Sequence, residues 1–187
     1  VFRRSRAPAM VGCAVLAGYV GFQYMLKQKA LELGEQYRAS RGLAEAKVVA
    51  HPRPVSPFNW TVFVSDAQAH RFAHVNLIRD EALPYRDGDG FIRRVDAPYL
   101  PVAKAEWTER PRFGTAERAL AEEAWNSESL GFFRWFAELP VYDGMTDGSE
   151  CVWFTDLRFL TPGRGSMPFR FAACRDSPGA TWRFRER

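Results

Sequence analysis

An uncharged run near the start of the chain constrains the fold more than any other feature. The segment from Ala7 to Leu26 contains no Asp, Glu, Lys or Arg. Its length is close to the roughly 20 residues that a helix needs to cross the core of a bilayer. Tyr19, Phe22 and Tyr24 lie toward its far end, as aromatic residues at a membrane interface do. The sequence therefore predicts a transmembrane helix over residues 7–26, with the lipid bilayer as its partner.

Two other interpretations of this run stay open. A signal peptide has a similar basic start, but no A-x-A cleavage site follows the apolar residues. A buried helix of a soluble protein is the second alternative, because glycines dilute the hydrophobicity of the run. Gly12, Gly18 and Gly21 would also allow close packing against other transmembrane helices. We therefore expect upstream transmembrane helices of the same protein as partners.

Basic residues flank the run on both sides. Arg3, Arg4 and Arg6 precede it, which favours a cytoplasmic N-terminus, whereas Lys27 and Lys29 beyond it weaken that orientation. The net charge of +4 is small and scattered along the chain. This pattern predicts no nucleic-acid partner. Residues 1–26 are thus predicted to be a cytoplasmic flank and a transmembrane helix.

The next segment predicts an amphipathic stalk and a linker over residues 27–50. Apolar residues alternate there with Lys, Glu and Arg, and Gly42 is a plausible end for the helix. The Pro-rich run 51–57 is typical of a stiff, extended linker, so we place the domain boundary at residue 51. The chain begins with Val rather than Met, which we interpret as the start of a fragment of a longer protein.

Residues 51–187 predict one soluble, β-rich domain. Alternating apolar and polar residues predict a half-buried strand over 58–65, which a turn connects to a second strand over 70–78. Two short helices are expected next, capped by Thr115 and Ser127. They span residues 116–125 and 128–138, and predicted strands over 151–160 and 167–174 follow them. The predicted fold class is α+β, with an N-terminal transmembrane helix followed by a mainly antiparallel β domain with two short helices.

Asp156 and Arg158 are the candidate binding residues. They are two apart in a predicted strand and would therefore lie on one face of the sheet. One interpretation is a polar binding site, and the favoured one is an ion pair that organises a buried turn. No catalytic residue is assigned, because the sequence contains no nucleophile elbow, P-loop or dinucleotide-binding motif.

No metal site is predicted within this chain. His70 and His74 are four apart, but they fall in a predicted strand without an obvious third ligand, so we interpret them as surface residues. His51 belongs to the predicted linker. The segment 87–90 superficially resembles a calcium loop but lacks the other oxygen ligands, so we predict a turn. Asn59 starts a glycosylation sequon but lies inside a predicted strand, and we do not expect it to be modified.

Cys151 and Cys174 are a candidate disulfide, because they lie at opposite ends of the last predicted hairpin. One strand register places them directly opposite each other. The neighbouring register pairs Trp153 with Phe171 and puts the cysteines on different faces. A disulfide would suit an oxidising periplasm, and both registers stay open.

Four segments carry a resemblance to a known family. They are residues 54–60, 132–142, 154–159 and 168–171. Together they resemble the C-terminal part of a bacterial family described as inner-membrane metal-dependent hydrolases, some of them LexA-regulated. The resemblance covers about Ala7 to Ala173.

The resemblance implies a location in the bacterial inner membrane, with the soluble domain in the periplasm. It also implies a divalent metal in the full-length protein, held by His and Asp motifs of an N-terminal multi-span region. None of those motifs is in this chain, so no catalytic residue or ligand is carried over. The expected function is the extracytoplasmic C-terminal domain of a membrane-bound metal-dependent hydrolase. The alternative is a noncatalytic envelope binding or assembly module.

Overall fold

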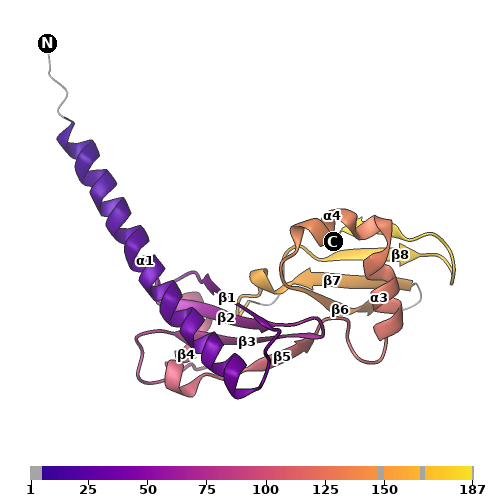
Figure 1. The fold of residues 1–187 in the computed structure, drawn as a ribbon, viewed down its shortest axis with the longest axis horizontal. Coiled ribbons are helices and arrows are strands. Elements are labelled where there is room, and N and C mark those ends of the chain that lie inside the picture. Colours follow the sequence, from indigo (N-terminus) through magenta and orange to yellow (C-terminus); the bar gives the residue numbers. More distant parts are fainter. Residues whose placement is uncertain (1–5, 147–149, 165–166, 187) are drawn as a thin grey trace, which may run out of the picture.

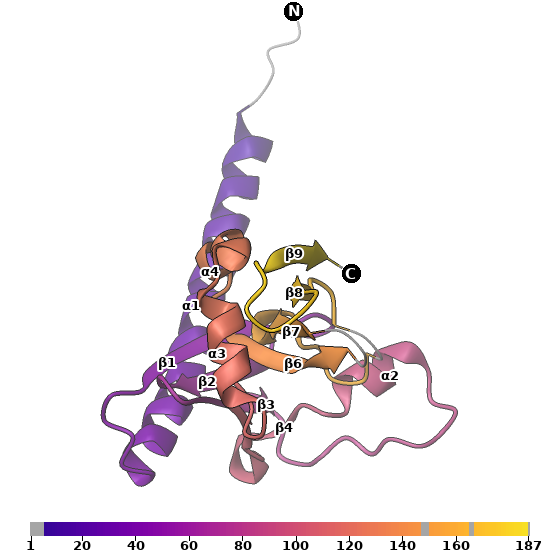
Figure 2. The ribbon, with the colours of Figure 1, turned by 90° about the vertical axis from the view of Figure 1, so that its right-hand side faces the viewer.

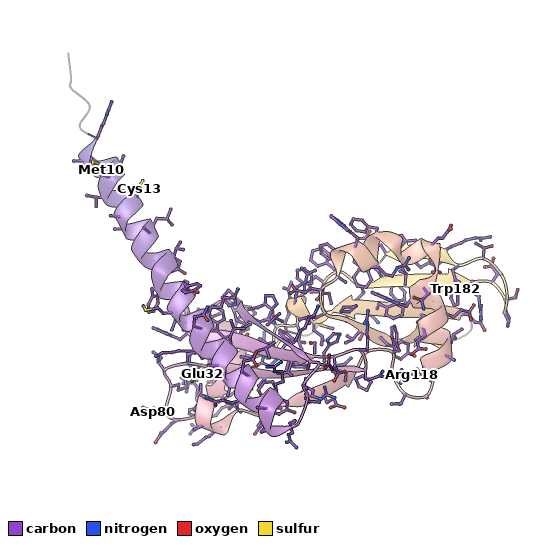
Figure 3. The ribbon with its side chains drawn as sticks, viewed as in Figure 1. Met10, Cys13, Glu32, Asp80, Arg118 and Trp182 are labelled. Carbon is purple, nitrogen blue, oxygen red and sulfur yellow. A yellow bond between two sulfur atoms is a disulfide. The ribbon has the colours of Figure 1, made fainter. Side chains whose placement is uncertain are left out.

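A long helix precedes two sheets in the computed structural model, which describes residues 6–146, 150–164 and 167–186. Helix α1 runs without a break from Ala7 to Ser40. Its N-terminal half projects away from the rest of the molecule, and Met10 and Cys13 extend from this bare part (Figure 3). By length and composition α1 is able to cross a membrane. The predicted flank residues Arg3 and Arg4 lie outside the described residues.

The C-terminal half of α1 packs against the first sheet. Leu26, Ala30 and Gly34 are its buried residues, and their spacing of four places them on one face of the helix. Gly34 lies so close to the sheet that a Cβ atom added to it would be 2.3 Å from Cγ1 of Val48 and 2.8 Å from Cγ1 of Val62. The segment predicted to be a stalk is therefore part of the domain core.

The first sheet contains five strands in the order β1-β2-β3-β4, with β5 also paired to β3. All its pairings are antiparallel except the short one between β3 and β4. The strands are β1 (Lys47–Pro52), β2 (Asn59–Ser65), β3 (Ala69–Asn76), β4 (Leu100–Pro101) and β5 (Thr108–Pro111). The 3-10 helix η1 (Val102–Lys104) links β4 to β5, and helix α2 (Phe91–Asp96) precedes them.

The second sheet is an antiparallel meander in the order β6-β7-β8-β9. Its strands are β6 (Pro140–Thr146), β7 (Glu150–Asp156), β8 (Phe171–Arg175) and β9 (Arg183–Glu186). Helices α3 (Arg118–Asn126) and α4 (Gly131–Phe136), joined by the 3-10 helix η2 (Glu128–Leu130), pack on one face of it. Another 3-10 helix, η3 (Leu157–Phe159), follows β7 directly. Figure 1 shows the two sheets side by side, with α1 on one and α3 and α4 on the other.

Strand β2 is buried on both faces. Trp60, Val62 and Val75 of neighbouring strands pack against α1. On the opposite face, Phe63 and Phe72 belong to a cluster that contains residues of the second sheet. The prediction of a half-buried strand is therefore wrong, because α1 covers one face and the second sheet covers part of the other.

The α+β fold class is confirmed, and so is the first hairpin. Several boundaries differ from the prediction. The boundary placed at residue 51 falls inside β1, because the start of the Pro-rich run pairs with β2. Thr115 caps no helix, since α3 begins at Arg118, and the hydroxyl of Ser127 bonds to the carbonyl oxygen of Ala124 instead of capping η2.

Candidate functional site

Asp156 and Arg158 form a tight contact where β7 ends. The Asp156 carboxylate is fully buried and accepts hydrogen bonds from the backbone nitrogen of Arg158 at 2.9 Å and from its Nε at 2.8 Å. It also accepts one from the backbone nitrogen of Glu138 at 2.9 Å. Arg158 in turn donates to the carbonyl oxygen of Phe136 at 2.6 Å.

These contacts join the end of α4 to the turn after β7. Arg158 lies in η3 rather than in the strand, so the expectation that both residues share one strand is wrong. The geometry fits the interpretation of an ion pair that organises a buried turn. The bonds to Asp156 come from the protein itself, which makes its carboxylate a poor candidate for a general base.

Cys151 and Cys174 lie directly opposite each other on β7 and β8. Of the two expected registers, the structure has the one that pairs the cysteines. Phe171 is therefore opposite Phe154 and not opposite Trp153. Their sulfur atoms are bonded in a disulfide. The cross-link joins the two central strands of the second sheet.

A polar surface lies inside the fold, on the face of the first sheet opposite α1. Residues that pair across β1, β2 and β3 supply it: His51 pairs with Thr61 and Thr61 with His74, and Asn59 pairs with Asn76. We call it the inner polar face, and it consists of His51, Arg53, Asn59, Thr61, His74 and Asn76. The polar residues that alternate along β2 therefore point into the molecule rather than into water. This corrects the expectation that His74 is a surface residue.

Hydrogen bonds connect the members of the inner polar face. The Thr61 hydroxyl accepts a bond from Nε of Arg53 at 2.6 Å and lies 2.8 Å from Nδ1 of His74. The Asn59 amide donates to Asp96 at 2.7 Å and accepts a bond from Asn76 at 2.7 Å. Asn59 is fully buried, which agrees with discounting it as a glycosylation site.

Burial changes the proton affinity of two side chains at this face. Burial, together with the nearby Arg53 cation, lowers the pKa of His74 to about 4. Burial also raises the pKa of Tyr99 to about 12. Both groups are therefore neutral at pH 7. We assign the proton of His74 to Nε2, so that Nδ1 accepts the Thr61 hydroxyl.

Arg53 is the cation that belongs to the inner polar face itself. Its NH1 donates to the carbonyl oxygen of Arg158 at 2.6 Å, so it connects the two sheets. Neither its NH2 group nor the Tyr99 hydroxyl has a hydrogen-bonding partner among the described residues. Such unpaired buried groups mark a place where water or a small polar ligand binds favourably. The inner polar face is thus suited to binding and to structural support rather than to nucleophilic catalysis.

A separate pocket of about 480 Å³ lies between the sheets. Arg112 and Trp125 line it, and the Arg112 guanidinium carbon is 5.4 Å from the Trp125 ring centroid. Nε of Arg112 has no hydrogen-bonding partner among the described residues, and burial lowers its pKa. His70 also lines the pocket, but its nitrogens are engaged by the Ser65 hydroxyl at 2.8 Å and the Pro140 carbonyl at 2.9 Å.

Among the described residues, side chains able to bind a metal do not gather in one place. Within the described part of the chain, no group of three His, Cys, Asp or Glu side chains could hold a metal ion. His70 is a buried, hydrogen-bonded residue and not the surface residue that we expected. His51 lies in β1 opposite Thr61, not in a linker. The residues present therefore do not fit a divalent metal centre.

Sequence reasoning missed Arg53, Tyr99 and Arg112. Arg53 was hidden in a Pro-rich run that predicted a linker, and Tyr99 lies in an irregular segment. One pattern in the sequence could have indicated the inner polar face. The polar residues alternate along β2, and the nearby apolar helix is able to cover the apolar face of that strand. No family model, curated protein or solved structure matches the chain.

Proposed function

We propose that this chain is the membrane-anchored, extracytoplasmic domain of a metal-dependent hydrolase of the bacterial inner membrane. In this proposal α1 crosses the membrane and the two sheets lie in the periplasm. The metal and the catalytic residues belong to another part of a longer protein, and this domain supports or covers their site. The disulfide suits the oxidising periplasm.

The observation that carries the proposal is the continuity of α1. A single helix provides a bare apolar half and a half that is packed into the domain core. Movement of the membrane span is thereby coupled to the position of the domain, without a flexible linker between them. The resemblance to inner-membrane hydrolases supplies the proposed activity.

The test compares the complete protein with a version that lacks residues 41–187. Deletion from residue 41 keeps α1 whole, whereas deletion from residue 51 would divide β1. Bound metal is measured by elemental analysis, and hydrolysis is measured on a panel of ester, amide and phosphoester substrates with and without added divalent metal. We expect the shortened protein to retain metal and to lose hydrolysis. Unchanged hydrolysis would contradict the role proposed for this domain.

The pocket beside Arg112 favours a second candidate function, a noncatalytic envelope binding module. An arginine without an acidic partner among the described residues, stacked on an aromatic ring, is a suitable site for a carboxylate or phosphate group. A thermal-shift screen with small carboxylates and phosphate monoesters would test this function. Stabilisation that disappears in the Arg112→Gln variant would support it, and equal behaviour of both proteins would exclude this pocket.

A further inference from the structure

The bare part of α1 is only as long as a bilayer core is thick. Leu26 is the first buried residue of the helix, and the stretch from Ala7 to Met25 is about 28 Å long at about 1.5 Å per residue. The hydrocarbon core of a bilayer measures about 30 Å. Phe22 already contacts the domain, with its ring centroid 5.8 Å from that of Phe58. A domain that begins where the span ends must lie at the membrane surface.

The end of α4 lies beside the point where α1 leaves the domain. A pocket of about 690 Å³ is lined by Tyr19, Gln23 and Lys27 of α1 and by Glu138, which follows α4 closely in the chain. Figure 1 and Figure 2 both show α4 on the side of the second sheet toward which the bare end of α1 points. The end of α4 therefore lies close to the last turns of the apolar segment.

Helix α4 exposes two large aromatic side chains. Trp135 is 79% exposed and Phe132 is 59% exposed. Their rings pack together and continue into a cluster of five aromatic residues from α4, η3 and the segment before β8. The cluster consists of Phe132, Trp135, Phe136, Phe159 and Phe169.

This cluster is held rigidly by the domain. The Arg158 guanidinium carbon lies 5.1 Å from the Phe136 ring centroid and 5.4 Å from that of Phe159. Because Arg158 is itself bound to buried Asp156, the cluster is fixed to the end of β7. An exposed, rigid aromatic surface beside a membrane span has the composition of an interfacial belt, in which amphipathic Trp rings lie among lipid headgroups.

We propose that the outer face of α4, formed by Phe132 and Trp135, lies in the headgroup region of the bilayer that α1 spans. The proposal rests on the membrane span of the proposed function. Helix α1 then supplies one attachment and α4 supplies a second, which fixes both the height and the rotation of the domain on the membrane. The partner of this surface is lipid, because the surface lies close to the point where α1 emerges from the domain.

The experiment places an environment-sensitive fluorophore at three positions of the full chain in vesicles of phosphatidylethanolamine and phosphatidylglycerol. Native Cys13 reports on the span. Trp135→Cys and Ile92→Cys, each combined with Cys13→Ser, report on α4 and on a control surface. Ile92 is 66% exposed and lies on α2, which Figure 2 shows away from α4. The disulfide-bonded cysteines remain unlabelled without reduction.

We expect the label at position 135 to emit at shorter wavelength than the label at position 92 and to be quenched by lipids with a nitroxide near the headgroup. The label at position 92 should instead be quenched by aqueous iodide. If the label at Cys13 reports lipid while positions 135 and 92 behave alike, the α4 contact is wrong and the span stands. If the label at Cys13 reports water, the span itself fails, and the inference fails with it.

Discussion

Single buried polar residues connect the parts of this protein. A buried polar group is costly unless it forms hydrogen bonds, and a buried charge costs more. Asp156 meets this requirement with donors from η3 and from the end of α4. Arg53 meets it with Thr61 of the first sheet and with the backbone beside Asp156. These contacts bring segments together that are far apart in the sequence.

We expect Asp156→Asn to lower the free energy of unfolding by roughly 3 kcal/mol, because it removes the buried, closer carboxylate partner of Arg158 and leaves only Glu138 at 3.8 Å. The amide nitrogen of the new side chain would also face hydrogen-bond donors instead of accepting from them. Urea unfolding of the full chain in mild detergent would measure this. Glu122→Gln is the matched control, because Glu122 pairs with Arg118 at 2.8 Å on an exposed helix surface. Its effect should stay below about 0.5 kcal/mol. Equal effects of the two substitutions would contradict the role of Asp156.

His74 predicts a dependence of stability on pH. Its pKa is about 4 in the folded protein against 6.5 for an unperturbed histidine, so the unfolded chain binds more protons between these values. The stabilisation is complete above pH 6.5 and declines as the pH falls toward 4. Between pH 7 and pH 5 this residue alone should cost about 2 kcal/mol. Denaturation midpoints of the native protein and of His74→Gln should therefore converge at low pH, and parallel pH profiles would contradict the assignment.

At the scale of elements, helix α1 has two halves with different surroundings. Its glycines show the division, because a Cβ added to Gly12, Gly18 or Gly21 would meet nothing within 4 Å. One added to Gly34 would collide with two valines of the first sheet. A larger side chain is therefore accommodated at the glycines of the bare half of α1 and not at Gly34 of the packed half.

Gly34→Ala should destabilise the domain by about 1–3 kcal/mol, since stiff, β-branched valines cannot move aside without strain. Gly21→Ala is the control and should be neutral or slightly stabilising, because alanine favours the helix by about 1 kcal/mol. Thermal unfolding of both variants in detergent, followed by circular dichroism, provides the comparison. A neutral Gly34→Ala variant would show that α1 does not pack closely on β1 and β2.

At the scale of the whole molecule, α1 belongs both to the proposed membrane anchor and to the domain core. Its buried half covers Trp60, Val62 and Val75 of the first sheet. Val141 of the second sheet covers part of the opposite face, together with Leu139 before β6 and Leu157 of η3. Removal of either cover would expose a large apolar surface to water.

A chain that starts at residue 26 should therefore be soluble and folded, because it loses the bare half of α1 and, of the core contacts, that of Phe22 with Phe58. A chain that starts at residue 41 should aggregate, since the apolar face of the first sheet becomes exposed. Gel filtration and circular dichroism of the two proteins would distinguish these outcomes. Equal solubility and equal folding would mean that α1 is a simple tether.

Local patterns in the sequence determined the apolar helix, the first hairpin and the α+β class, because each depends on the spacing of apolar residues within one segment. The pairing of Cys151 with Cys174 stayed open, since adjacent registers differ only in which faces meet. The surroundings of Thr61 and His74 depended on packing between segments that are distant in the chain. Only the tertiary structure decided that their side of the sheet faces the interior, because a polar alternation has the same appearance whether water or a second polar surface covers it.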